Sequence, residues 1–219
     1  MKLTKKSKLV MMGDSITDCG RKRPIGESND GWGNGYVNIV VSHLAAEWPE
    51  YLIHIQNMGI SGNTVRDLKS RWQTDCLDLQ PDWVSIMIGI NDVWRQFDRP
   101  YQKGAGVPLS EYKETLEELI VKTKPLLSGG LILVTPYYIE SNKADPMRKC
   151  MDQFGACVKS LAKKHKTIFV DTQAAFDKTL KHTYSASIAK DRVHPITSGH
   201  TIIANAFLRA IGAMSPNKE

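Results

Sequence analysis

Short apolar runs alternate along this chain with longer segments in which apolar residues recur every three or four positions. A short apolar run that ends at a glycine or a polar turn is typical of a buried parallel strand, and the longer spacing is typical of an amphipathic helix. The pattern predicts strands over 8–12, 52–56, 83–88, 131–135 and 167–170, and helices over 36–48, 64–76, 110–124, 146–161, 173–181 and 197–210. Strands that alternate with helices predict an α/β fold, with a parallel sheet covered on both faces.

The predicted elements are joined by loops rich in glycine, proline and charge, and the loop over 21–35 stands out. A loop of this length after a first strand is usually functional or mobile. The chain contains neither an internal repeat nor a linker rich in proline and serine. We therefore expect 1–219 to form a single domain.

Composition and charge narrow the classes of function. The chain has 219 residues, of which 42% are hydrophobic, and this suits a globular domain with a sizeable core. Its formal net charge is +6, but the lysines are scattered, and the densest cluster, 163–166, ends a predicted helix, where cations are favourable. This distribution favours a solvated surface over a nucleic-acid-binding face. No apolar stretch is long enough to span a membrane.

The cysteines and the amino-terminal segment indicate a compartment. The four cysteines lie at positions 19, 76, 150 and 157, and these spacings fit no zinc-binding pattern. The basic start of the chain is followed by an apolar run too short for a signal peptide. We expect a cytoplasmic protein that needs neither a metal nor another cofactor.

Chemically useful residues gather in four segments, 13–15, 59–63, 89–92 and 191–195. The first three each follow a predicted strand, and the carboxyl ends of parallel strands meet at one edge of the sheet, where open α/β sheets bind ligands. The fourth segment precedes the last helix. Its position depends on tertiary contacts that the pattern does not show.

Ser15 is the candidate nucleophile of this edge, provided that a base accepts its proton. His194 is the best candidate base, because its unperturbed pKa lies near neutrality. Pro195 keeps His194 out of the helical region, so that its ring can project from an extended segment. Asp191 lies three residues earlier and can bind the other ring nitrogen, which would stabilise the imidazolium.

Acyl transfer also requires donors at the place where negative charge develops on oxygen. The backbone N–H of Ser15 and that of Gly62 are candidates, and the side-chain amide of Asn91 is a third. Each segment alone has a simpler explanation, namely a turn, a surface Asp–His pair or a glycine that allows positive φ. All four in this order, mostly at strand ends, are much less expected by chance.

The chain resembles the SGNH hydrolases, also called the GDSL esterase family. Four blocks carry the resemblance and span nearly the whole chain: GDSITD at 13–18, GISGNT at 59–64, GIND at 89–92 and DRVHP at 191–195. The resemblance implies a flavodoxin-like three-layer fold with strand order 2-1-3-4-5. It also implies Ser15, His194 and Asp191 as nucleophile, base and orienting residue, and Ser15, Gly62 and Asn91 as the oxyanion hole.

More narrowly, the first and third blocks with the residues that follow them resemble the intracellular bacterial acetyl xylan esterases of this family. This implies removal of O-acetyl groups from xylo-oligosaccharides, and a ring-like homo-oligomer. Asp14, Trp94 and Tyr184 are candidates for substrate binding. Aromatic residues in loops suit sugar rings, although they equally suit a packed loop. The candidate aromatics are Trp32, Trp94, Tyr101, Tyr137, Tyr138 and Tyr184, and the candidate loop arginines are Arg21, Arg23, Arg95 and Arg99.

Three alternatives remain open at this point. The protein could hydrolyse other small esters, or the same scaffold could be a carbohydrate-binding module without activity. A third alternative is metal-assisted phosphoester hydrolysis by Asp14, Asp18 and His194, although their spacing matches no two-metal pattern.

Overall fold

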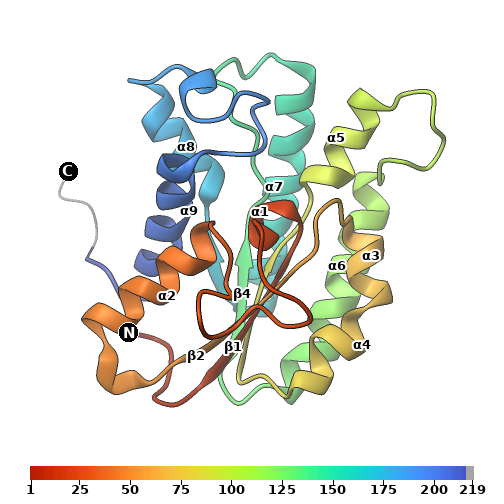
Figure 1. Ribbon diagram of the computed structural model, residues 1–219. Coiled ribbons are helices and arrows are strands. Elements are labelled where there is room, and N and C mark those ends of the chain that lie inside the picture. Colours follow the sequence, from red (N-terminus) through yellow and green to blue (C-terminus); the bar gives the residue numbers. More distant parts are fainter. Residues whose placement is uncertain (216–219) are drawn as a thin grey trace.

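The computed structural model describes residues 1–215, with a five-stranded sheet at the centre of the molecule (Figure 1). The strands are β1 (Lys8–Gly13), β2 (His54–Gly59), β3 (Trp83–Met87), β4 (Gly130–Val134) and β5 (Ile168–Val170). Their order is β2-β1-β3-β4-β5, and every neighbouring pair is parallel. The predicted α/β class and strand order are confirmed.

Helices cover both faces of this sheet and complete the three layers (Figure 1). On one face α2 (Tyr36–Glu47) packs against α9 (Thr197–Ala210), which also contacts α8 (Thr172–Leu180). The other face carries α3 (Val65–Ser70), α4 (Trp72–Asp75), α6 (Leu109–Thr123) and α7 (Pro146–His165). Two further helices follow strand ends directly, α1 (Ser15–Asp18) after β1 and α5 (Ile90–Asp98) after β3. Within residues 1–215, no helix combines the length and the apolar character that a membrane crossing requires.

The apolar runs that predicted the strands are buried because helices lie on both sides of them. Leu9, Val10, Met11 and Met12 are all fully buried, which explains why β1 shows a continuous apolar run rather than alternation.

The second strand differs from its prediction. It runs over His54–Gly59 and not over 52–56, and it passes straight through the predicted turn at 57–59. Leu52 instead ends a short 3₁₀ turn (Pro49–Tyr51) in the left-handed conformation. Asn57, the misleading turn residue, is fully buried, where its amide donates to the carbonyls of Thr17 and Trp32.

Two other local features differ from the sequence analysis. The residues after β3 begin helix α5, where the pattern predicted no helix, because Gly89 at φ 133° turns the chain directly into the helix. The helix predicted over 64–76 is divided at Arg71 into α3 and α4. The side chain of Arg71 donates to the carbonyls of Met58 and Gly13, so that the break lies beside the ends of β1 and β2.

Candidate active site

A hydrogen-bonded chain of three side chains joins the two ends of the sequence. Ser15 Oγ lies 2.9 Å from His194 Nε2, and His194 Nδ1 lies 2.7 Å from Asp191 Oδ2. Ser15 opens α1 just after β1, and His194 lies in the loop before α9. The structure therefore brings together the serine, histidine and aspartate singled out in the sequence.

The loop that carries His194 is fixed on several sides. Oδ1 of Asp191 accepts hydrogen bonds from the backbone N–H groups of Val193 and His194, at 3.0 and 2.8 Å. Arg192, which lies between Asp191 and Val193, adopts φ 62°, and its guanidinium pairs with the Glu140 carboxylate at 2.7 Å. These contacts turn the backbone so that Asp191 and His194 face each other.

The charge of Asp191 determines which nitrogen of the neutral His194 ring carries the proton. Burial raises the pKa of Asp191, but hydrogen bonds from the His194 ring and from the backbone outweigh burial and hold the pKa below its usual value. An ionised Asp191 accepts a hydrogen bond from the N–H at Nδ1 of His194, so that the proton of the neutral ring stays on Nδ1. Nε2 is then free to accept the proton of Ser15, which is the arrangement a general base requires.

The position of Ser15 depends on two glycines that end neighbouring strands, Gly13 and Gly59, which face each other in register. A Cβ on Gly59 would lie 2.2 Å from the backbone nitrogen of Asp18, and a Cβ on Gly13 would lie 2.1 Å from Thr17 Oγ1. Helix α1 therefore sits directly on both strand ends. Gly59 serves this close approach rather than a positive φ.

The candidate oxyanion donors come from three different strand ends. Gly62 lies at φ 85° in open space, within a turn closed by a 3.2 Å hydrogen bond from Asn63 N to Ile60 O. Asn91 is buried at the start of α5 and donates one amide hydrogen to Asn63 O at 2.9 Å. Its amide has a second hydrogen, and the backbone N–H of Ser15 lies at the start of α1.

The three candidate substrate-binding residues have very different environments. Asp14 is buried, caps α1 through the N–H of Ile16 at 3.0 Å, and has its pKa raised by burial to about 7. The Trp94 ring meets the His194 ring edge-on at 5.8 Å between centroids, and the Arg95 guanidinium lies over Trp94 at 4.6 Å. Tyr184 is 74% exposed. These surroundings favour a structural role for Asp14 and a position for Trp94 against the base.

The loop arginines are mostly engaged with the protein itself. Arg21 is buried and donates to the carbonyls of Gly59 and Pro24, at 2.7 and 2.6 Å. Arg23 pairs with Asp18 at 2.7 Å, and Arg95 pairs with Asp98. Among residues 1–215, no group of three or more potential ligand side chains is placed to hold a metal ion.

Sequence reasoning missed a buried histidine beside the site. His200 Nδ1 accepts from the Tyr36 N–H at 3.2 Å, so that Nε2 carries the proton and faces Cys19 Sγ at 3.4 Å. Burial, aided by the charge of His194, lowers the pKa of His200 to about 4, and burial raises the pKa of the Cys19 thiol. No pattern along the chain connects these residues, because 181 positions separate Cys19 from His200.

Comparison with known proteins supports one family. The model of the GDSL-like Lipase/Acylhydrolase family matches residues 11–202. An acetylxylan esterase of Geobacillus stearothermophilus is 57% identical over 213 residues, which are 97% of each chain.

Solved structures agree with this match. The crystal structure of Axe2, an acetylxylan esterase from Geobacillus stearothermophilus, is similar with a TM-score of 0.95 over 97% of each chain at 57% identity. Further Axe2 structures are described as catalytic mutants in which a serine, an aspartate or a histidine is replaced by alanine. LAE5, an alpha/beta hydrolase from the metagenome of Lake Arreo in Spain, is 48% identical, with a TM-score of 0.96 over 99% of this chain and 100% of that one.

Proposed function

The chain belongs to the GDSL-like Lipase/Acylhydrolase family, and we propose that it is a serine esterase that removes O-acetyl groups from carbohydrates, with acetylated xylo-oligosaccharides as substrates. The observation that carries this proposal is the hydrogen-bonded chain Ser15–His194–Asp191. Such a chain supplies a nucleophile, a base and an anion that stabilises the protonated base.

The proposed reaction has two halves. Ser15 Oγ attacks the acetyl carbonyl while His194 accepts its proton, and the oxyanion that forms accepts hydrogen bonds from Ser15 N–H, Gly62 N–H and the Asn91 amide. The intermediate collapses to an acetyl-enzyme, and the sugar hydroxyl leaves with the proton from His194. Water then attacks the acetyl group with His194 again as base, which releases acetate and restores Ser15.

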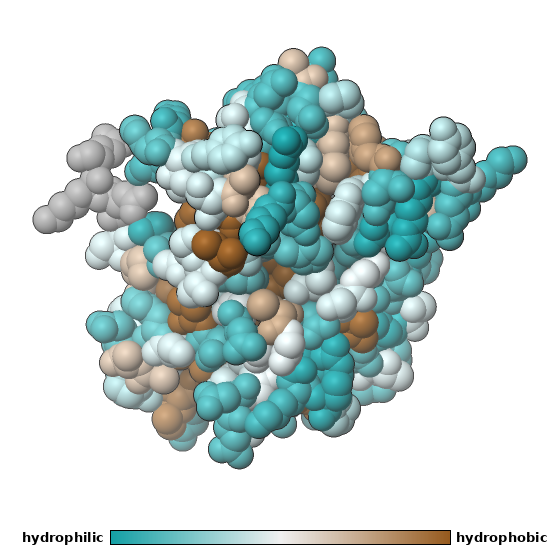
Figure 2. All heavy atoms as spheres, turned by 45° about the horizontal axis from the view of Figure 1, so that its top comes forward, coloured by the Kyte–Doolittle hydropathy of each residue, from teal (hydrophilic) through white to brown (hydrophobic). Residues whose placement is uncertain are grey.

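The openness of the site supports a carbohydrate ester over a long-chain lipid ester. The side chains of His194 and Asp191 are 45% and 41% exposed. Figure 2 shows the molecule with the top of Figure 1 turned toward the viewer. This face is largely hydrophilic, with apolar residues in small separate groups. A sugar chain suits such a face better than an alkyl chain does. The specific sugar is proposed from the name of the acetylxylan esterase relatives.

Three further properties belong to this proposal. Residues 1–219 would form one domain, the enzyme would work in the cytoplasm, and it would assemble as a homo-oligomer. The domain is supported by the continuous sheet. The other two properties are supported by the resemblance of the GDSITD and GIND blocks to intracellular esterases that form rings.

The deciding experiment compares the wild type with Ser15→Ala on acetylated xylo-oligosaccharides and on p-nitrophenyl esters of increasing acyl length. We expect the wild type to release acetate and to prefer acetyl over longer acyl groups, and Ser15→Ala to fold normally but lose turnover by about 10⁴-fold or more. Chelator should leave wild-type activity unchanged. Equal turnover by Ser15→Ala would refute the mechanism, and a preference for long acyl chains would refute the proposed substrate class.

A further inference from the structure

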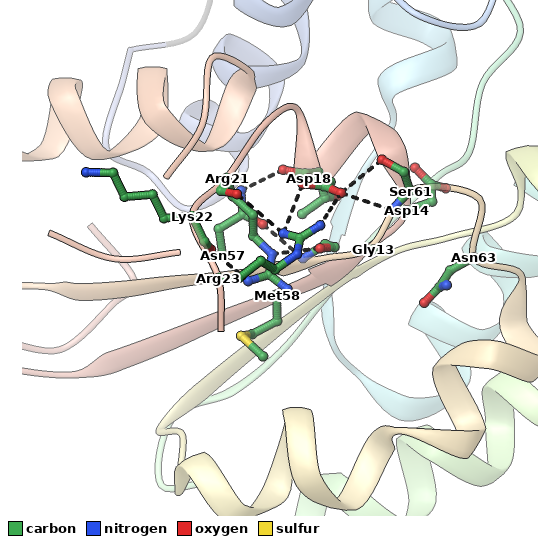
Figure 3. A network of polar contacts seen from close by, with 12 residues as sticks. Gly13, Asp14, Asp18, Arg21, Lys22, Arg23, Asn57, Met58, Ser61 and Asn63 are labelled. Atoms are coloured by element: carbon green, nitrogen blue, oxygen red, sulfur yellow. Dashed lines mark hydrogen bonds and ion pairs between the residues drawn. The ribbon is translucent and has the colours of Figure 1, made fainter. Parts of the chain in front are cut away.

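The turn that carries Gly62 is held by a carboxylate of α1. Oδ2 of Asp18 accepts from the backbone N–H of Ser61 at 3.0 Å and from Ser61 Oγ at 2.9 Å. The same carboxylate pairs with Arg23 at 2.7 and 3.1 Å, and Figure 3 shows it between the two partners. Asp18 lies three residues after Ser15 in the same helix. One short helix therefore carries the nucleophile at its start and holds the neighbouring turn at its end.

The position of Ser61 decides where the Gly62 N–H points. The turn over residues 60–63 has Ser61 and Gly62 at its centre, and a positive φ at the third position is characteristic of a type II turn. The peptide between the two central residues carries the Gly62 N–H. In a type I turn this peptide is flipped by about 180°, which reverses the direction of that N–H.

The other side of the turn is also anchored. Arg71 Nε donates to the side-chain oxygen of Asn63 at 2.7 Å, and the Asn91 amide donates to the Asn63 carbonyl at 2.9 Å. Apart from its two chain neighbours, a Cβ on Gly62 would meet no heavy atom of the described residues within 4 Å. The neighbours of Gly62 are thus held while Gly62 itself lies open, and Asp18 is the group that holds the preceding residue.

We propose that Asp18 is a positioning residue for the oxyanion hole, because it holds Ser61 so that the Gly62 N–H points at the developing oxyanion. This rests on the proposed esterase function. The carboxylate is suited to the task because Asp18 is buried with only 4% exposure and both of its partners donate to it. Burial raises the pKa of Asp18, but the hydrogen bonds from Arg23 and Ser61 outweigh it, so that the pKa stays below its usual value.

The chain contains a matched control for this contact. Oδ2 of Asp67 accepts from the backbone N–H and the hydroxyl of Thr64, at 2.8 and 2.7 Å, as Asp18 does from Ser61. Asp67→Ala removes the same kinds of hydrogen bond, here from Thr64, which precedes α3 and lies two positions after Gly62. Asp67 is exposed, whereas Asp18 is buried and also pairs with Arg23. Asp67→Ala therefore controls for the loss of the two hydrogen bonds near Gly62, and the unfolding temperatures of both variants report the additional structural loss in Asp18→Ala.

The experiment measures kcat, KM and the affinity of a boronic acid, whose tetrahedral adduct with Ser15 places an oxygen in the oxyanion hole. Both variants are assayed with p-nitrophenyl acetate well below their unfolding temperatures. We expect Asp18→Ala to lower kcat about tenfold or more and boronate affinity by a similar factor, with KM within about twofold of wild type. Asp67→Ala should stay within about twofold in kcat. The midpoint of the pH profile of kcat/KM should not move, because His194 and Asp191 are untouched.

Asp18→Asn provides a second test, since its amide oxygen can still accept from Ser61 and should restore part of kcat. If Asp18→Ala does not fold, Asp18→Asn is compared with Asp67→Asn, and a lower kcat in Asp18→Asn supports the proposal. The proposal is overturned if the Asp18 and Asp67 variants have equal kcat, if the loss lies in KM, or if the pH midpoint shifts. Wild-type protein without Ser15-dependent turnover would overturn the esterase function as well, so that the two failures are distinguishable.

Discussion

Asp14 and Asp92 are two buried carboxyl groups close to the candidate site, and each has its pKa raised to about 7. Burial is the main cause for both, and repulsion from Asp14 adds to the rise of the Asp92 pKa. Asp92 Oδ1 accepts from Val65 N at 3.0 Å, but its Oδ2 is buried without a hydrogen-bond partner among residues 1–215. The neutral form of Asp92 is therefore the form that this environment favours.

Replacing Asp92 by Asn should change how stability depends on pH. A carboxyl whose pKa is raised in the folded protein contributes stability below its unfolded pKa of about 4, and this contribution is lost as the pH rises toward 7. Asp92→Asn cannot ionise. We expect the free energy of unfolding of Asp92→Asn to increase relative to that of wild type by about 1–3 kcal/mol between pH 4.5 and pH 7.5, so that the variant becomes relatively more stable, as measured by urea denaturation at both pH values.

The comparison with wild type is necessary because His200 acts in the opposite direction. Its pKa is lowered to about 4, so that its contribution to stability grows as the pH rises from about 4 to 6.5. The difference between wild type and Asp92→Asn removes this shared term. A difference that stays constant over the whole pH range would show that Asp92 does not titrate there.

At the scale of elements, the approach of α1 to the ends of β1 and β2 determines where Ser15 lies. We expect Gly59→Ala to lower the unfolding temperature and to remove nearly all esterase activity, because its Cβ would lie 2.2 Å from Asp18 N and would push α1 away. Thermal unfolding and turnover of p-nitrophenyl acetate are the measurements.

Gly155→Ala, within α7, is the control for this change. Its Cβ would meet only Thr135 Cγ2, at 4.0 Å, so the substitution should increase stability by about 0.5–1 kcal/mol through helix propensity and leave turnover unchanged. Full activity in Gly59→Ala would mean that the contact between α1 and β2 does not position the serine.

The elements also show where sequence reasoning succeeds and where it does not. Strand β1 was predictable because burial on both faces requires a continuous apolar run, and α7 because Pro146 starts a long periodic segment. Strand β2 was misplaced because Asn57 and Gly59 are used for tertiary contacts, with Thr17 and α1, and not for a turn. Local patterns cannot distinguish these two uses of the same residue types.

The same distinction applies to the site. Ser15 was predictable at this edge because the carboxyl ends of parallel strands meet there. Asp191 and His194 could be singled out by their chemistry, but only the structure shows that their loop reaches Ser15. The contacts of Asp18 with Ser61 and of His200 with Cys19 were not predictable, because they join residues far apart in sequence whose types have many other uses.

At the scale of the whole molecule, the strand order explains why the site lies where it does. The chain leaves β1 for β2 on one side and returns to β3 on the other, and open α/β sheets bind ligands beyond the carboxyl ends of the strands at such a reversal of strand order. Ser15 follows β1, Gly62 follows β2 and Asn91 follows β3. Only His194 and Asp191 come from elsewhere, the loop before α9.

The net charge of +6 is also a property of the whole molecule, and we expect it not to attract substrates to this site. Three arginines of the segments around the site, Arg23, Arg95 and Arg192, are each paired with a carboxylate, of Asp18, Asp98 and Glu140 respectively. Pairing cancels much of their field, and salt screens the scattered lysines over about 10 Å at 0.1 M.

The measurement is kcat/KM for a neutral and an anionic acetyl ester at 20 and 300 mM salt. The kcat/KM of the anionic ester divided by that of the neutral ester should change by less than about twofold between the two salt concentrations. A cationic site would lower this quotient by about tenfold or more at the higher salt concentration. Glu140→Gln leaves Arg192 unpaired and should introduce a salt dependence for the anionic ester alone. A strong salt dependence already present in the wild type would show that the site carries an unbalanced positive charge.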